Sequence, residues 1–283
     1  MRIILSRKGF DSSAGGCPSP ILPDGRLCSL PIPDDRSPIT YSSVDFDGVN
    51  LGELLALLTG DGAWHGSGAH LDPDLRADAL PRSPGWKPLL GQSGSAQGHL
   101  RNESVTVGDL FLFFGSFRPI QQAADGWRFI PDQMPRHVIW GWLQVGEILK
   151  VDELPSDAVA WARYHPHFAY GEDPSNTLYL ATERLNLDQL AREFPGAGTF
   201  RSVDERLVLT APESRLQTRW KLPAFFAPGA GREGLSFHRN RSRWTMEGNR
   251  CLLNSAFRGQ EFVLDTAGCG LALDWLIDLL AAA

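Results

Sequence analysis

A loop directly after the first predicted strand carries side chains that could bind a phosphate group. The apolar residues 3–5 predict a short strand, which leads into Ser6, Arg7 and Lys8 and then into a glycine-rich loop. Two adjacent cations could pair with a phosphate while the glycines let backbone N–H groups approach it. Lys8 precedes the glycines, so the loop is not a Walker A motif. We predict Ser6, Arg7 and Lys8 to contact a nucleotide, with Lys8 also taking part in catalysis.

The same loop offers an acid beside hydroxyl groups. Asp11 and Ser12 are neighbours in the sequence. Asp11 could act as a base, and together with Ser12 it could hold a ribose hydroxyl. The alternative is a structural loop in which both side chains satisfy backbone groups.

Three histidines are predicted at the ends of barrel strands. In an extended segment His165 and His167 would face one way, as a metal pair or as acid–base groups near pH 7. His137 begins a long predicted strand and could project into the same opening. Ligand sites commonly lie in the mouths of β-barrels, so we expect these histidines and the N-terminal loop to share one cleft. A loop that packs its aromatic residues on the barrel is the alternative.

A second histidine pattern could bind a metal ion. His70 and Asp72 lie at positions i and i+2, and His99 could complete a set of two histidines and a carboxylate. Such a set suits iron or zinc. The alternative is that Asp72 caps a turn ahead of Pro73.

Near the end of the chain, cations alternate with an aromatic residue. Arg239, Arg241 and Trp244 could bind a single strand through phosphate contacts and base stacking. Arg258 precedes Gln260, whose amide can read a base edge. An ordinary solvated face with ion pairs is the alternative.

Charge is distributed unevenly along the 283 residues. The net charge is −6, yet the segment from Arg215 to Arg258 holds nine Arg or Lys and only two acidic residues. The net negative charge argues against a protein that simply coats nucleic acid. The basic segment favours a local anionic partner such as DNA or a nucleotide.

The four cysteines lie far apart and form no C-x-x-C pair, which predicts reduced thiols and a cytoplasmic protein. No apolar run is long enough for a membrane span.

Periodicity and turn residues predict a single α+β domain in three parts. These are a loop-rich part (1–104), a barrel-like core (105–210), and a basic segment with a final helix (211–283). Helices are expected at 51–58, 187–194 and 271–280, and strands at 3–5, 105–117, 138–151, 176–182, 207–209 and 262–264. Residues 60–102 are expected to be irregular because Gly and Pro punctuate them throughout.

The central part resembles a known group of small curled domains. V-G-D precedes an apolar strand, and an I-x-G-W-x-x-V strand follows about 25 residues later, as in PUA-like barrels of the ASCH and EVE type. The resemblance implies a curled β-barrel, often one that binds RNA or unusual bases.

The whole chain resembles a narrower family. The segments S-R-K-G-F-D-S, P-S-P-I-x-P-D-G, H-x-D-P-D-L, G-D-L-F-L-F-F-G, H-V-I-W-G-W-L-Q and R-G-Q-E-F-V-L-D are similar to the nucleotide modification associated domain 3 family. The resemblance implies a link to DNA base modification, to defence of bacteria or phages, and to other proteins of such a system. We expect an enzyme acting on a nucleotide or nucleic-acid base. The alternatives are a reader of modified bases or a structural subunit of a modification or restriction complex.

Overall fold

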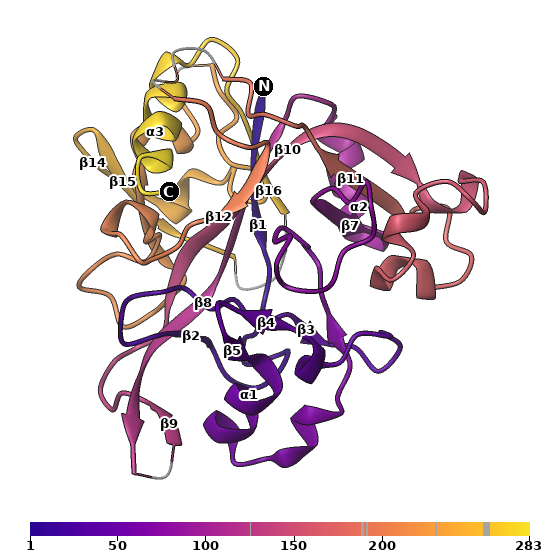
Figure 1. Cartoon of the computed structure of the whole chain (residues 1–283). Coiled ribbons are helices and arrows are strands. Elements are labelled where there is room, and N and C mark those ends of the chain that lie inside the picture. Colours follow the sequence, from indigo (N-terminus) through magenta and orange to yellow (C-terminus); the bar gives the residue numbers. More distant parts are fainter. Residues whose placement is uncertain (125, 188–189, 191, 230, 257–260) are drawn as a thin grey trace.

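Two long antiparallel strands, β8 (Leu110–Ala123) and β10 (Arg136–Lys150), run through the middle of the molecule (Figure 1). The computed structural model describes residues 1–124, 126–187, 190, 192–229, 231–256 and 261–283. Residues 110–114 of β8 are fully buried, since both faces of this strand are covered. A strand that is covered on both faces has a continuous run of apolar residues in its sequence, which is why this strand could be predicted.

The large sheet has nine strands. Its main path follows the order β16-β1-β8-β10-β11-β7, with β12 beside β10 and both β2 and β9 beside β8. The remaining bounds are β1 (Arg2–Arg7), β2 (Ser19–Ile21), β7 (Leu89–Gln92), β9 (Gly126–Phe129), β11 (Thr177–Ala181), β12 (Ala197–Thr199) and β16 (Glu261–Asp265). The predicted strands at 3–5, 105–117, 138–151, 176–182 and 262–264 therefore exist, although β8 begins and ends later than expected.

Strand β1 holds a central place in this sheet. It pairs with β8 in parallel and with β16 antiparallel, with Ser6 opposite Glu261. Ile3, Ile4 and Leu5 are fully buried, so the backbone that leads into Arg7 and Lys8 is fixed on both sides. The charged loop therefore leaves the sheet from a rigid strand.

The sheet does not close into the expected barrel. In the described chain its path ends at β16 on one side and at β7 on the other, and no backbone pairing joins these two strands. A side-chain bridge links them instead, because the Gln92 amide donates to Glu261 Oε1. The Ser6 hydroxyl donates to the same oxygen over 3.0 Å. The fold is thus mixed α+β with an open sheet, and the PUA-like resemblance is not confirmed.

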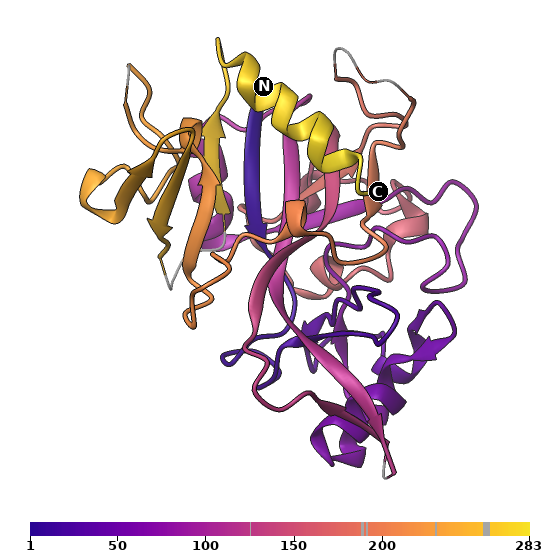
Figure 2. The same ribbon diagram turned by 90° about the vertical axis from the view of Figure 1, so that its left-hand side faces the viewer.

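Among the described residues, three α-helices accompany the sheets: α1 (Leu51–Thr59), α2 (Gly94–Asn102) and α3 (Gly270–Leu280). The side chain of Asn50 caps α1 by accepting from the Glu53 N–H over 3.1 Å, and Gly60 ends it at a φ of 74°. Helix α3 lies across one face of the central strands (Figure 2). The predicted helices at 51–58 and 271–280 are confirmed.

Three other expectations about elements need correction. The described residues within 187–194 form no helix, while 188, 189 and 191 lie outside the described residues. Residues 207–209 are not a strand, since Leu207 ends a short 3-10 helix, Glu205–Leu207, and Val208 makes only an isolated bridge with Val138. The passage 60–102 is not wholly irregular, since it contains β7 and α2. Helix α2 was missed because its sequence is rich in Gly and Ser and poor in apolar residues.

Smaller elements complete the fold. The small sheets are formed by β13 (Arg219–Pro223), β14 (Trp244–Glu247) and β15 (Arg250–Asn254), by β3 (Ile32–Pro33) with β6 (Ala69–His70), and by β4 (Asp45–Phe46) with β5 (Val49–Asn50). Residues 10–80 largely gather beneath the sheet around α1 (Figure 1), with their own buried cluster centred on Phe10 and Tyr41.

The buried carboxyl group at the junction of β1, β7 and β16 predicts a pH-dependent stability. Burial raises the pKa of Glu261 to about 7, against the opposing effects of Lys8 and the Ser6 hydrogen bond. A raised pKa in the folded state means that stability falls as pH rises from about 4.5 to about 7. Replacing Glu261 with Gln removes this titration. The stability of the variant relative to the wild type should therefore increase by up to about 3 kcal/mol across that interval.

Urea unfolding of both proteins at about pH 5 and about pH 8 measures this difference. The comparison cancels the other titrating groups, which the two proteins share. A stability difference that stays constant with pH would show that Glu261 is ionised throughout.

Candidate functional site

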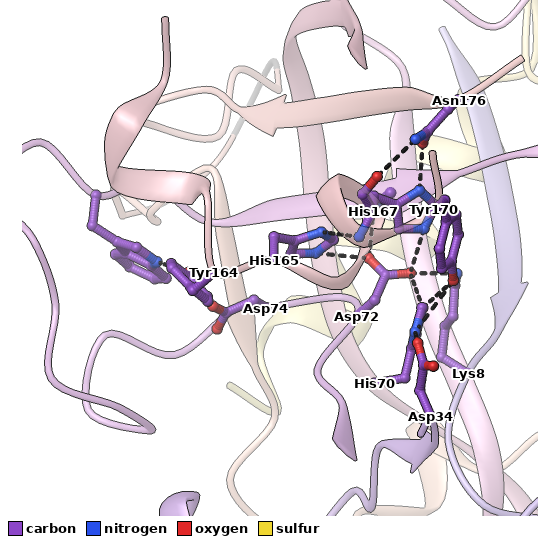
Figure 3. Close-up of polar contacts among 12 residues, drawn as sticks. Lys8, Asp34, His70, Asp72, Asp74, Tyr164, His165, His167, Tyr170 and Asn176 are labelled. Carbon is purple, nitrogen blue, oxygen red and sulfur yellow. Dashed lines mark hydrogen bonds and ion pairs between the residues drawn. The ribbon is translucent and has the colours of Figure 1, made fainter. Parts of the chain in front are cut away.

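A buried carboxylate, Asp72, lies at the centre of a cluster of cationic and imidazole side chains (Figure 3). Its Oδ2 atom is 3.1 Å from Lys8 Nζ, 3.9 Å from His70 Nε2 and 4.0 Å from His167 Nε2. Its Oδ1 atom accepts the Gly91 N–H over 2.6 Å and lies 3.4 Å from His165 Nε2. The five side chains come from three segments that are far apart in the sequence, at residue 8, residues 70–72 and residues 165–167.

The histidines are held by short secondary structure elements and by polar partners. His70 belongs to β6, and its Nδ1 atom lies 2.9 Å from Asp34 Oδ2. His167 lies in a short 3-10 helix, Pro166–Ala169, and its Nδ1 atom is 2.6 Å from Asn176 Oδ1. The Asn176 amide also donates to the His167 carbonyl over 2.8 Å. Each imidazole is therefore fixed on one side and directs its other nitrogen towards Asp72.

A second buried cluster holds the segment that carries Asp72. Asp74 accepts two hydrogen bonds of 2.7 Å from Arg82 and one of 2.5 Å from the Tyr164 hydroxyl. The Trp86 indole N–H donates to that hydroxyl over 2.7 Å. Tyr164 precedes His165, so this cluster ties the Asp72 loop to the histidine loop.

The first cluster, around Asp72, opens into a cavity of about 240 Å³. Its lining includes the side chains of Arg7, Lys8, Asp11, Ser13, His70, Asp72, Gln92, His167 and Tyr170. The N-terminal loop and the histidine loops therefore meet around one hollow. Besides the backbone of its glycines, the hollow is lined mostly by polar groups, as expected of a site for a polar ligand.

Electrostatics keep the central acid charged and one histidine neutral. Burial alone would raise the pKa of Asp72, but the Lys8 ammonium and His165 hold it well below its usual range. Burial lowers the pKa of His167 to about 4, although Asp72 opposes this shift. Burial likewise lowers the pKa of His70. At neutral pH His167 is a neutral imidazole, which can accept a proton or bind a metal ion.

Asp11 lines the cavity and makes the contacts expected of a structural loop residue. Its Oδ1 atom accepts from the Ser13 N–H, the Ser13 hydroxyl and the Ala14 N–H, and its Oδ2 atom accepts from Arg7 over 2.7 Å. Although burial opposes the change, these bonds and the Arg7 charge lower its pKa. A carboxylate with its acceptor sites so occupied shapes the loop and orients Arg7.

Other predicted residues lie outside the cavity. Ser6 is buried against Glu261, and Ser12 is exposed beside the loop. His137 accepts from the Trp220 indole N–H over 2.9 Å, and burial lowers its pKa to about 3. His137 is thus a neutral core histidine.

His99 does not lie with His70 and Asp72. It is on α2, where its Nε2 atom is 2.9 Å from the Ser236 hydroxyl and its ring packs on Phe237. His167 occupies the position that the sequence pattern assigned to His99. His70, Asp72 and His167 each offer one possible ligand atom, and these three atoms all lie within 4.8 Å of one another. The three residues could therefore hold a metal ion.

Arg239, Arg241 and Trp244 of the basic segment do not line this cavity. Arg239 pairs with Glu103 over 2.9 Å and with Glu233 over 2.8 Å, whereas Arg241 is exposed. Trp244 is partly buried and its indole N–H donates to the His238 carbonyl over 2.7 Å. Arg258 and Gln260 lie outside the described residues.

Sequence reasoning missed three polar residues of the site: Gln92, Tyr170 and Asn176. Tyr170 lies in the cavity wall, with its hydroxyl 3.3 Å from both nitrogens of His70. The aromatic residues around H-P-H signalled Tyr170, but nothing in the spacing signalled Asn176, whose pairing with His167 depends on the turn between them.

The geometry defines a mixed α+β protein whose buried aspartate, lysine and histidines open into a small polar cavity. The chain belongs to the nucleotide modification associated domain 3 family, whose model matches residues 2–265. The family's name links the chain to nucleotide modification. No curated protein and no solved structure matches the chain. In the part of the chain that the structure describes, every helix is too short or too polar to cross a membrane.

The Asp74 cluster predicts a large energetic cost for one arginine substitution. Replacing Arg82 with Met leaves the buried Asp74 carboxylate without its cation, which should destabilise the protein by about 3–5 kcal/mol. Replacing Arg184 with Met is the matched control, because its 2.5 Å pair with Glu193 is largely exposed. The control should cost less than about 1 kcal/mol. Urea unfolding at neutral pH measures both values, and equal costs would contradict the structural role of Arg82.

Proposed function

We propose that this chain is an enzyme that acts on the base of a nucleotide or nucleic acid and binds its phosphate beside Arg7 and Lys8. The observation that carries the proposal is the buried Asp72, which lies beside Lys8 and three imidazoles. Asp72, Lys8 and two of these imidazoles, those of His70 and His167, line a polar cavity. Membership of the family supports a nucleotide as the substrate class. The four free cysteines fit a cytoplasmic enzyme.

The cationic side of the cavity supports phosphate binding. Arg7 and Lys8 both line the cavity, and Gly9 continues that wall at a φ of 97°, a conformation that suits glycine. A volume of about 240 Å³ is near the lower end of small-ligand sites, which suits one nucleotide unit rather than a duplex. A nucleic-acid substrate would therefore insert a single base or end, and exposed Arg241 would hold the flanking strand.

The cost of burying these groups supports catalysis over recognition alone. Charged groups in a protein interior lose several kcal/mol of hydration each, and binding a base requires no such cluster. Clusters of buried titratable groups with shifted pKa values concentrate at catalytic sites. In the proposed reaction the neutral His167 imidazole would either accept a proton from the bound substrate or hold a metal ion that activates it, and Lys8 would stabilise negative charge. A reader or a structural subunit would bind without turnover.

The phosphate contact can be tested with ligands that differ by one group. Isothermal titration with the four deoxynucleoside 5′-monophosphates and the matching nucleosides compares binding with and without phosphate. Replacing Lys8 with Met should weaken monophosphate binding by at least about tenfold, because a desolvated charge pair is lost. Replacing Lys87 with Met is the control, since Lys87 is exposed and does not line the cavity.

Two results would contradict the proposal. Equal affinity for nucleosides and monophosphates would remove the phosphate contact at Lys8. Unchanged bases after incubation of DNA and nucleotides with the protein, read by mass spectrometry of the digested products, would favour a reader over an enzyme.

A further inference from the structure

We propose that His70, Asp72 and His167 bind one divalent transition-metal ion. The three residues are buried, and their ligand atoms lie within 4.8 Å of one another at the cavity wall. The inference concerns the same cavity as the proposed function, but it stands apart from nucleotide binding and is tested without a nucleotide.

The hydrogen bonds fix the protonation state that a metal ligand needs. The Nδ1 atom of His70 faces a carboxylate oxygen of Asp34, which can only accept. The Nδ1 atom of His167 faces the carbonyl oxygen of Asn176, whose amide nitrogen is used on the His167 backbone. Both Nδ1 atoms therefore carry the proton, and both Nε2 atoms present lone pairs. Metal-binding histidines are oriented by this kind of outer partner.

The aspartate is oriented in the same way. Its Oδ1 atom is taken by the Gly91 N–H, which leaves Oδ2 facing the two Nε2 atoms at 3.9 and 4.0 Å. His165 is not part of this set of ligands. Its Nδ1 atom accepts the His167 N–H, and its Nε2 atom lies 3.4 Å from the other carboxylate oxygen of Asp72, Oδ1. Figure 3 shows the two imidazoles and the carboxylate converging on one point.

The Lys8 ammonium group lies where the metal ion would have to bind. Its ammonium lies 3.1 Å from Asp72 Oδ2, the same oxygen that would bind the metal. Ligand atoms around an ion with bonds of about 2.1 Å lie about 3.0–3.4 Å apart, so binding requires the three side chains to close by roughly 1 Å. The long Lys8 side chain can turn into the adjoining cavity as the ion takes its place. Metal and Lys8 therefore compete for one carboxylate.

The donor set selects the kind of metal. Two imidazoles and one carboxylate suit iron(II) and zinc(II), whereas magnesium prefers oxygen ligands. Three protein ligands leave coordination positions open towards the cavity, where water or a substrate atom would bind.

The test is a titration of metal-stripped protein with cobalt(II), whose visible absorption reports coordination by nitrogen ligands. We expect one equivalent of cobalt(II) to bind. Zinc(II) should displace it, iron(II) under anaerobic conditions should displace it only in excess, and magnesium should not displace it. The Asp72→Asn and His167→Ala variants should lose affinity by at least about a hundredfold, since even outer-partner changes cost tenfold or more. Lys8→Met should bind at least about tenfold tighter, because the competing charge is gone.

His99→Ala is the matched control and should bind as the wild type does, because His99 lies on α2 beside Ser236. Circular dichroism confirms that each variant is folded. The wild-type titration decides by itself: less than one equivalent bound in both the wild type and Lys8→Met overturns the site. Cobalt(II) binding of unchanged affinity in Asp72→Asn overturns the ligand assignment. If Asp72→Asn does not fold, His70→Gln takes its place, and unchanged binding in that variant overturns the assignment in the same way.

Discussion

The rest of this structure depends on one carboxylate that has almost no access to water. Asp72 stays ionised in the interior because Lys8 and His165 lower its pKa against the effect of burial. A buried charge without such partners would cost several kcal/mol, so its neighbours are constrained as strictly as the acid itself. The loop of residues 6–16, the segment 70–92 and the segment 164–176 must all reach the same point, and the fold is arranged to bring them there.

Each of these segments is tied down by bonds that are not part of the cavity. Strand β1 is fixed between two neighbours, Asp74 is clamped by Arg82 and Tyr164, and Asn176 holds His167 from behind. Gly91 shows how closely these parts approach, since a methyl group on its Cα would lie 2.2 Å from the His167 ring. The site is rigid because loops that bear its side chains are anchored by buried polar clusters rather than by long helices.

The sequence allowed β1, β8, β10, β11 and β16 and two of the three described α-helices to be predicted, because apolar runs bounded by turn residues indicate buried strands. The shorter strands carry no such apolar run. The sequence could not distinguish an open sheet from a barrel, because closure depends on whether the two end strands pair through their backbones. In the structure a side-chain hydrogen bond between Gln92 and Glu261 links β7 to β16 in place of backbone pairing. The pattern of His70 and Asp72 placed two members of the cluster together, but spacing could not choose among the remaining histidines. His99 is close in sequence yet α2 carries it towards Ser236, whereas His167 arrives from about a hundred residues away.

The pairing of β1 with β16 joins the two ends of the chain, which leave the ribosome at very different times. Ser6 and Glu261 are 255 residues apart, yet they lie side by side and hold the strand from which Lys8 projects. Strand β1 leaves the ribosome long before β16 is synthesised, so the edge of β1 that pairs with β16 stays unpaired during most of translation. Contacts of such high sequence separation form slowly. The strand that leads into Lys8 is therefore fixed on both sides only after nearly all of the chain has left the ribosome.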